Sequence, residues 1–258
     1  MPPSTEDLAQ AVIARNANRG ISTPNRPWAS YQSWDNLLTC HWPLDPAVLR
    51  PKVPAELEID TFDGQAWLGL IPMYMGTIRL RDVGGIPTEP HFPEINFRTY
   101  VRYGGRSGVY FFHVDAGALL VDIGARLFFH TPYEPAEVTY QPTADGGFTF
   151  SSHRILPPHQ TFEAAFRPKG TPAACPPGSL LEFQAERYSG FARTITGEIV
   201  RGDLIHDPWL LQEVDAEITQ NTILSSAGFD LPMAPAMVHY APGVDVVLWT
   251  FDDVTMTS

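Results

Sequence analysis

Residues 94–134 read EINFRTYVRYGGRSGVYFFHVDAGALLVDIGARLFFHTPYE and carry the densest polar signals of the chain. From 94 to 103 the even positions are polar or charged, whereas the odd positions are mostly apolar. In a β-strand these two sets lie on opposite faces. The GGRSG segment then reverses the chain into VYFFHVDA, and a Gly-Ala-Arg turn comes before Pro132. The stretch therefore predicts a hairpin with one polar face, followed by further strands.

The register of this hairpin follows from the turn. If Tyr103 pairs with Val109, the apolar face continues through Phe111, and Arg98 lies beside Val114. A shift of one residue would exchange the two faces of the second strand, because side chains alternate along it.

The composition favours a mainly β protein built from short elements. The 258 residues include 25 Pro and 20 Gly, and only 18% are charged, which predicts many turns rather than long surface helices. About a dozen short strands separated by turn signals favour a barrel or sandwich with peripheral helices. We expect a single domain over 1–258, with 1–27 as an N-terminal helical and connector extension.

Few helices are predicted. Residues 5–18, TEDLAQAVIARNAN, indicate a helix that Ser4 or Thr5 caps, with acidic residues in its first turn. Ser179, followed three residues later by Glu182, matches the capping-box pattern and predicts another helix start.

Local patterns also predict brief helices at 45–54 and 221–229. Two hairpins are expected, one between 57–64 and 65–80, and one within 235–254.

The charge balance excludes two classes of partner. Against 29 acidic residues stand 17 basic ones, which gives a formal net charge of −12. Nucleic-acid binding needs a clustered basic face, and an anionic membrane surface would repel this chain. No apolar run of 18 residues occurs, and the N-terminus MPPSTEDLAQ is polar and unlike a signal peptide. We predict a cytoplasmic protein with no nucleic-acid and no membrane partner.

Familiar metal, nucleophile and phosphate patterns are missing from the sequence. The eight histidines show no HxH, HxxxH or HExxH spacing, and neither GxSxG nor GxGxxG occurs. Cys40 and Cys175 lie far apart and are expected to be reduced thiols. We therefore predict no metal site and no cofactor.

Several segments resemble the YqjF-like family of uncharacterised proteins, which is similar to acetoacetate decarboxylase. The resemblance covers roughly residues 28–250. It rests on HWPLDPAVLRPKVPAELEIDTFDGQAWLGLIPMYM, FPEINFRTYVRYGGRSGVYFFHVDA, GARLFFHTPY, ERY and HDPWLLQ. It implies a curved antiparallel sheet closed into an acetoacetate decarboxylase-like barrel or cone, with a few short helices and a ligand cavity inside. It also implies a homo-oligomer.

The sequence departs from that superfamily at its reactive amine. The decarboxylase keeps paired lysines directly after the proline that corresponds to Pro132, and one of them forms a Schiff base. Here Tyr133 and Glu134 follow this proline, and neither is a primary amine. The two lysines of the chain, Lys52 and Lys169, lie in distant Pro-rich segments. We therefore expect a protein that is not a Schiff-base acetoacetate decarboxylase.

The resemblance also suggests site residues. Glu94 matches the superfamily's cavity glutamate, and Arg126 matches the arginine of its Gly-Arg turn, with one intervening alanine. The predicted catalytic residues are Glu94, Arg126 and Tyr133. The predicted ligand-binding residues are Asn96, Arg98, Tyr100 and Glu134. The alternative reading places the polar face of 94–102 in solvent or in internal ion pairs, and makes Tyr133 a core tyrosine.

The sequence leaves two functions open. One is a small-molecule-binding β-barrel with lyase-like or other enolate chemistry on a small organic acid or carbonyl compound, without a Schiff-base lysine. The other is a non-enzymatic ligand-sensing or interaction protein on a decarboxylase-derived scaffold.

Overall fold

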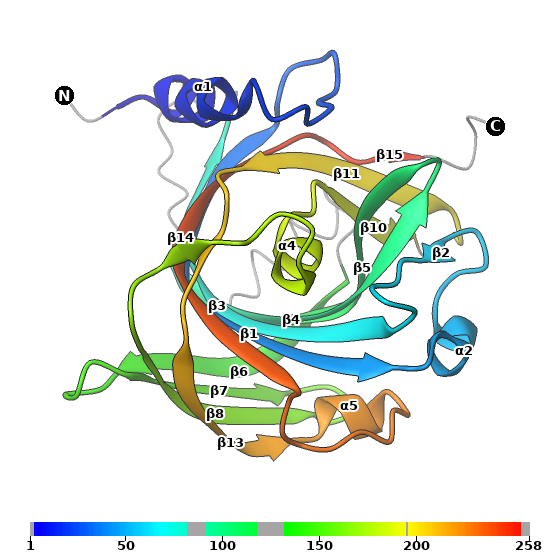
Figure 1. The fold of residues 1–258 in the computed structure, drawn as a ribbon, viewed down its shortest axis with the longest axis vertical. Coiled ribbons are helices and arrows are strands. Elements are labelled where there is room, and N and C mark those ends of the chain that lie inside the picture. The colour runs from blue at the N-terminus through cyan, green and yellow to red at the C-terminus, as the bar shows by residue number, and fades with distance from the viewer. Residues whose placement is uncertain (1–2, 82–90, 118–131, 195, 254–258) are drawn as a thin grey trace.

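A computed structural model describes residues 3–81, 91–117, 132–194 and 196–253. Strands dominate it, and the helices are short (Figure 1). The helical elements are α1 (Thr5–Asn16), α2 (Pro46–Leu49), the 3-10 helix η1 (Arg50–Lys52), α4 (Leu180–Ala185) and α5 (Ile223–Ser226). The strands are β1 (Ser30–Leu44), β2 (Glu58–Ile59), β3 (Ala66–Leu80), β4 (Phe92–Tyr103), β5 (Arg106–Ala116), β6 (Tyr133–Pro142), β7 (Phe148–Arg154), β8 (Thr161–Pro168), β9 (Ala173–Ala174), β10 (Ser189–Arg193), β11 (Ile199–His206), β12 (Leu210–Leu211), β13 (Val214–Asn221), β14 (Met237–Leu248) and β15 (Asp252–Asp253).

Seven of the described strands close into a ring. The pairing runs β4–β5–β10–β11–β14–β1–β3 and returns from β3 to β4. Figure 1 looks into this ring, with α4 inside it. Strands β6, β7, β8 and β13 continue from β5 as a second layer below the ring (Figure 1). The predicted mainly β fold class is confirmed, and the sheet is mixed, because β5 pairs in parallel with both β10 and β6.

Both faces of β4 are buried, for different reasons. The odd residues Ile95, Phe97 and Val101 join a large apolar cluster that also includes Phe150 and Phe162 of the second layer. The even residues face the inside of the ring, beside the inward residues of β3. Solvent therefore does not cover the polar face of β4 as far as residue 100.

The predicted hairpin is present, but its register differs from the expected one. Tyr103 pairs with Arg106, not with Val109, and Arg98 pairs with Phe111, not with Val114. Gly104 and Gly105 form a two-residue turn with φ of 56° and 78°. Two successive positive φ values suit the tight turns that match strand twist, so the loop of the hairpin is shorter than predicted. A bulge between the Phe97 and Arg98 pairs shifts the remaining register.

Of the two other predicted hairpins, one is confirmed only at its turn and one was wrong. Phe62 and Gln65 pair across the predicted Asp63-Gly64 turn. Strand β2 of the same segment pairs with β4, because β1 and β4 already occupy the two edges of β3. Segment 235–254 contains the single long strand β14, which runs straight through Pro242. Pro242 lies opposite Asn36, a residue with φ of 52° that β1 leaves out of the pairing. The missing N–H of the proline therefore costs no ladder hydrogen bond.

The predicted helices are confirmed. Ser4 caps α1 through a capping box with Asp7, and Asp45 caps α2 directly before its proline. Ser179 accepts a hydrogen bond from the Glu182 N–H at 3.2 Å and so starts α4. None of the described helices is long and apolar enough to span a bilayer.

Helix α1 packs on the outside of the ring. Its Ala9 and Val12 are fully buried in a cluster with Trp28, Val247 and Trp249. The single-domain arrangement stays a prediction.

The ring closes where β10 crosses β5 at close range. A Cβ added to Gly108 of β5 would lie 2.3 Å from the backbone oxygen of Ser189. Backbone atoms cannot move aside as a flexible side chain can, so this contact requires glycine.

We expect Gly108→Ala to lower the free energy of unfolding by about 1–3 kcal/mol, the usual cost of overpacking. Gly117→Ala is the matched control, because its Cβ would have no neighbour among the described residues closer than 3.8 Å. Urea denaturation of both variants measures the difference. Equal stability of the two would show that the β5–β10 crossing does not constrain the ring.

Candidate functional site

A polar stripe runs along the inside of the ring on β4. Its members are buried, with exposed fractions of 4% for Glu94, 5% for Asn96, 7% for Arg98 and 0% for Tyr100. They lie beside Gly69, Ile71 and Met73 of β3 in the sheet register. We name these four residues the inner stripe.

Glu94 and Tyr133 meet inside the ring. The Tyr133 hydroxyl donates a hydrogen bond to Glu94 Oε2 at 3.0 Å. Tyr133 comes from β6, and β5 lies between it and Glu94, with Ala116 as the pairing partner of Glu94. The small Ala116 side chain leaves room for the tyrosine to reach across β5. This contact joins two of the three predicted catalytic residues.

Asn96 has unused hydrogen-bonding capacity. Its Nδ2 lies 3.8 Å from Met73 Sδ, a weak acceptor, and its Oδ1 has no hydrogen-bond partner among the described residues. A buried amide oxygen in this state favours a water molecule or a ligand as its partner.

Arg98 carries a buried positive charge that no described residue balances with an ion pair. It makes no hydrogen bond or ion pair to any residue in the described ranges, and its Nε is buried. Its Cζ lies 5.9 Å from the ring centres of both Tyr100 and Trp209. Aromatic faces attract a cation only modestly, and an uncompensated buried charge is costly. The arrangement therefore favours an anion at Arg98.

Tyr100 contacts His41, which is not among the predicted site residues. His41 Nε2 lies 2.7 Å from the Tyr100 hydroxyl oxygen. Burial first, and then the charges of Arg98 and His239, hold the pKa of His41 well below its usual value. The sequence signal was weak, because a lone histidine in an apolar strand is usually structural.

Glu134 does not join the inner stripe. Glu134 pairs with Asp115 on the face of β5 and β6 opposite to Tyr133, because consecutive strand residues alternate. Arg154 Nε donates to Asp115 Oδ1 there at 2.9 Å, and the pair is buried. Arg126 lies outside the described residues, so its catalytic role stays a prediction, as does ligand binding by Glu134.

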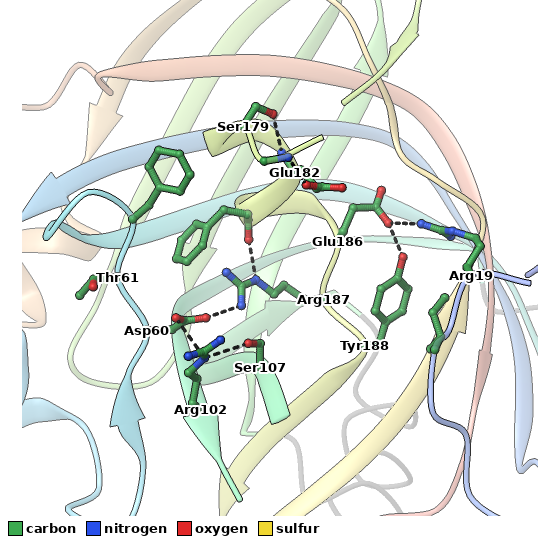
Figure 2. Close-up of a pocket in the computed structure, with 14 residues that line it drawn as sticks. Arg19, Asp60, Thr61, Arg102, Ser107, Ser179, Glu182, Glu186, Arg187 and Tyr188 are labelled. Atoms are coloured by element: carbon green, nitrogen blue, oxygen red, sulfur yellow. Dashed lines mark hydrogen bonds and ion pairs between the residues drawn. The ribbon is translucent and has the colours of Figure 1, made fainter. Parts of the chain in front are cut away.

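A hollow of about 710 Å³ lies at the Arg102 end of β4 (Figure 2). We name it the mouth pocket. Four of its charged residues form two pairs: Arg187 donates to Asp60 at 2.6 Å, and Arg19 donates to Glu186 at 2.7 Å. The residues that line it are Arg19, Ile21, Asp60, Thr61, Phe62, Arg102, Ser107, Gly178, Ser179, Glu182, Phe183, Glu186, Arg187 and Tyr188.

The mouth pocket borders the inner stripe. The Arg187 guanidinium lies 5.1 Å from the ring centre of Tyr100, and the ring centres of Phe183 and Tyr100 are 5.1 Å apart. These two side chains therefore stand between the pocket and the interior of the ring.

Neither lysine of the chain reaches the inner stripe. Lys52 is exposed and donates to the Ala227 carbonyl at 2.6 Å. Lys169 is also exposed and pairs with Asp215. The inside of the ring therefore contains no lysine amine for a Schiff base. The described residues also contain no group of three or more His, Cys, Asp or Glu side chains that could hold a metal.

Comparison with known proteins shows the family. Residues 31–245 match the DUF2071 family, described as an uncharacterized conserved protein. This chain belongs to that family. It is 39% identical over 238 residues to the uncharacterized protein YqjF of Bacillus subtilis (strain 168), with 92% of this chain and 98% of that protein covered. The resemblance to the YqjF-like family is confirmed.

Solved structures share the fold of this DUF2071 protein. The enduracididine biosynthesis enzyme MppR complexed with pyruvate has a TM-score of 0.61 at 13% identity and covers 91% of this chain and 93% of its own. Acetoacetate decarboxylase from Legionella pneumophila has a TM-score of 0.60 at 14% identity, covering 93% and 95%. An acetoacetate decarboxylase-like enzyme from Sphingomonas wittichii RW1 has a TM-score of 0.57 at 16% identity, covering 90% and 96%. At these identities the likeness shows the fold alone.

We expect Tyr133→Phe to lower the free energy of unfolding by about 1–3 kcal/mol, because the buried Glu94 carboxylate loses a donor. Tyr74→Phe is the matched control: the Tyr74 side chain is partly buried, and its hydroxyl has no hydrogen-bond partner in the described ranges. Denaturant unfolding measures both. Equal losses in the two variants would contradict a stabilising Tyr133–Glu94 contact.

Proposed function

We propose that the inside of the ring binds a small organic carboxylate, which Arg98 holds through its guanidinium group. The observation that carries the proposal is the burial of Arg98 without an ion pair to any described residue. A planar guanidinium presents paired N–H donors that match the two oxygens of a carboxylate. A bound carboxylate would supply the missing counter-charge.

The overall charge of the protein does not attract the carboxylate, so binding depends on the groups that touch it. The chain carries a net charge of −12, so its overall field repels anions and does not steer them. Affinity for a carboxylate must then come from short-range contacts at Arg98. Tyr100 and Trp209 flank its guanidinium and keep water away, which strengthens each charged hydrogen bond.

The reaction class follows from Glu94 and Tyr133. Glu94 lies on the same inward face as Arg98, and we infer that the long Arg98 side chain holds the acid with its carbonyl end toward Glu94. A buried carboxylate can remove a proton next to a carbonyl group. Once Glu94 has taken that proton it no longer needs the hydrogen of Tyr133, so the Tyr133 hydroxyl can turn that hydrogen to the oxygen where negative charge develops. We infer enolate-type chemistry on a small carbonyl acid, with Glu94 as base and Tyr133 as hydrogen-bond donor.

The fold relatives support a small acid as ligand but not a covalent amine step. The MppR structure is complexed with pyruvate. Both lysines of this chain are exposed and lie outside the ring, so the imine route has no amine here. Proton transfer without a covalent intermediate is therefore the chemistry that we propose.

A second function, a non-enzymatic ligand sensor, rests on the same missing amine. In that case Arg98 still binds the acid, and Glu94 with Tyr133 forms only a structural hydrogen bond. The two functions differ in whether the bound molecule exchanges a carbon-bound proton.

The remaining parts of the proposal rest on sequence alone. We propose a cytoplasmic, single-domain protein that self-associates and has no nucleic-acid partner. The acidic charge balance supports the absence of a nucleic-acid partner.

We expect pyruvate, 2-oxobutyrate, acetoacetate or phenylacetate to raise the thermal midpoint of the wild type. In Arg98→Met we expect the dissociation constant of the tightest binder to rise about 10- to 100-fold, because the variant loses the hydrogen bonds between a charged donor and the carboxylate. Arg167→Met is the control, because Arg167 is exposed on β8. Thermal shift and calorimetry measure the changes. The proposal fails if no carboxylate stabilises the wild type, or if Arg98→Met binds as tightly.

We expect the bound oxo acid to lose its protons next to the carbonyl to solvent in D₂O, observed by proton NMR. Glu94→Gln should slow this exchange at least about 100-fold, the usual contribution of a general base. Glu137→Gln, on the exposed side of β6, serves as the control. Tight binding of the acid without exchange in the wild type would select the sensor function instead.

A further inference from the structure

His41 lies at the junction of three strands that build the Arg98 end of the inner stripe. It comes from β1 and reaches Tyr100 of β4 past Gly69 of β3. A Cβ added to Gly69 would lie 3.3 Å from His41 Nε2 and 3.4 Å from Arg98 Cγ. The glycine therefore lets the imidazole and the arginine stem pack against the same spot of β3.

We propose that His41 is a positioning residue: its Nε2–H donates to the Tyr100 oxygen, so that the Tyr100 hydroxyl hydrogen is free for the carboxylate on Arg98. This inference rests on the proposed function, since it describes how the same site selects its ligand.

The hydrogen-bond inventory favours this tautomer over its alternative. If Tyr100 donated to His41 instead, the imidazole would carry its hydrogen on Nδ1. That atom is buried and has no partner among the described residues, so a donor there would stay unsatisfied with or without ligand. In the proposed tautomer Nδ1 is only an unused acceptor, which proteins tolerate better than an unused donor. The remaining donor is then the Tyr100 hydroxyl, which a carboxylate can satisfy.

The surroundings keep His41 neutral. Burial and the charges of Arg98 and His239 both oppose protonation of the imidazole. A neutral imidazole has one donor and one acceptor, so its tautomer fixes the direction of the hydrogen bond to Tyr100. Arg98 then supplies the positive charge that binds the carboxylate, and the neutral His41 only orients the Tyr100 hydroxyl.

This arrangement of donors favours a carboxylic acid over the corresponding primary amide. Arg98 and Tyr100 both present donors, so the ligand group between them needs acceptors on both sides. A carboxylate meets this need, whereas the corresponding primary amide would bring an N–H₂ donor against a donor. His41 is therefore a determinant of acid over amide discrimination.

The tautomer can be tested without any ligand. In protein labelled with ¹⁵N-histidine, ring-nitrogen shifts distinguish protonated from bare nitrogens, and comparison with His41→Gln assigns the His41 signals. We expect a protonated Nε2 and a bare Nδ1. A protonated Nδ1 would overturn the proposal.

Binding variants test the consequence for specificity. We expect His41→Met to weaken the tightest carboxylate of the panel about tenfold and to leave its primary amide unchanged. His41→Gln should restore binding to within about threefold, because the glutamine amide can place an N–H where Nε2 was. Tyr100→Phe should match His41→Met, and the double variant should lose no more than either alone. His153→Gln is the control, because His153 is half-exposed on β7 and pairs with Glu163.

The outcomes separate this inference from the function on which it rests. If Arg98→Met loses the carboxylate but His41→Met does not, the inference is wrong and the binding function stands. If Arg98→Met binds as well as the wild type, the proposed function itself is wrong. Equal loss of acid and amide in His41→Met would indicate a packing role only and would also overturn the inference.

Discussion

The structure depends on how β5 divides one of its edges between two strands. Val109 and Tyr110 pair with β10, which closes the ring, whereas Val114 to Ala116 pair with β6, which begins the second layer. Both pairings are parallel, and the other edge of β5 is bound to β4 along its length. Because β6 starts at this fork, its first residue, Tyr133, enters the ring, and its second residue, Glu134, faces the second layer. The pairing of one edge of β5 with both β10 and β6 thus determines how the ring joins the second layer. It also determines where Tyr133 meets Glu94.

Both faces of β4 are buried, so its polar side chains lose their contacts with water. An ordinary antiparallel strand can leave its polar face in water, but the ring and the second layer exclude water from both sides. Each polar side chain of the inner stripe therefore needs a partner inside the protein or from a ligand. Glu94 and Tyr100 have such partners, in Tyr133 and His41. Arg98 has only aromatic faces among the described residues, which makes it the place where a bound anion would gain most.

The likeness to acetoacetate decarboxylase-like structures concerns the fold and not the side chains inside the ring. The fold is shared at 13–16% identity, so the ring can persist while its reactive groups change. After Pro132 this chain supplies a tyrosine that bonds to Glu94, and both of its lysines are exposed. The inside of the ring therefore holds an acid, Glu94, and a hydrogen-bond donor, Tyr133, and no lysine amine. Our proposal of proton transfer is the chemistry compatible with what remains.

The sequence by itself determined the polar and apolar faces of residues 94–103, the caps of the helices and the absence of a lysine after Pro132. These features are local: they depend on strand alternation, on capping side chains and on residue identity. The hairpin register was missed, because the Gly104–Gly105 turn and a bulge fixed it by backbone geometry. Only the tertiary structure decided that the polar face points into the ring, because parity separates two faces without saying which one is enclosed. It also brought His41 to Tyr100, 59 positions away in the sequence, through strand pairings that no local pattern encodes.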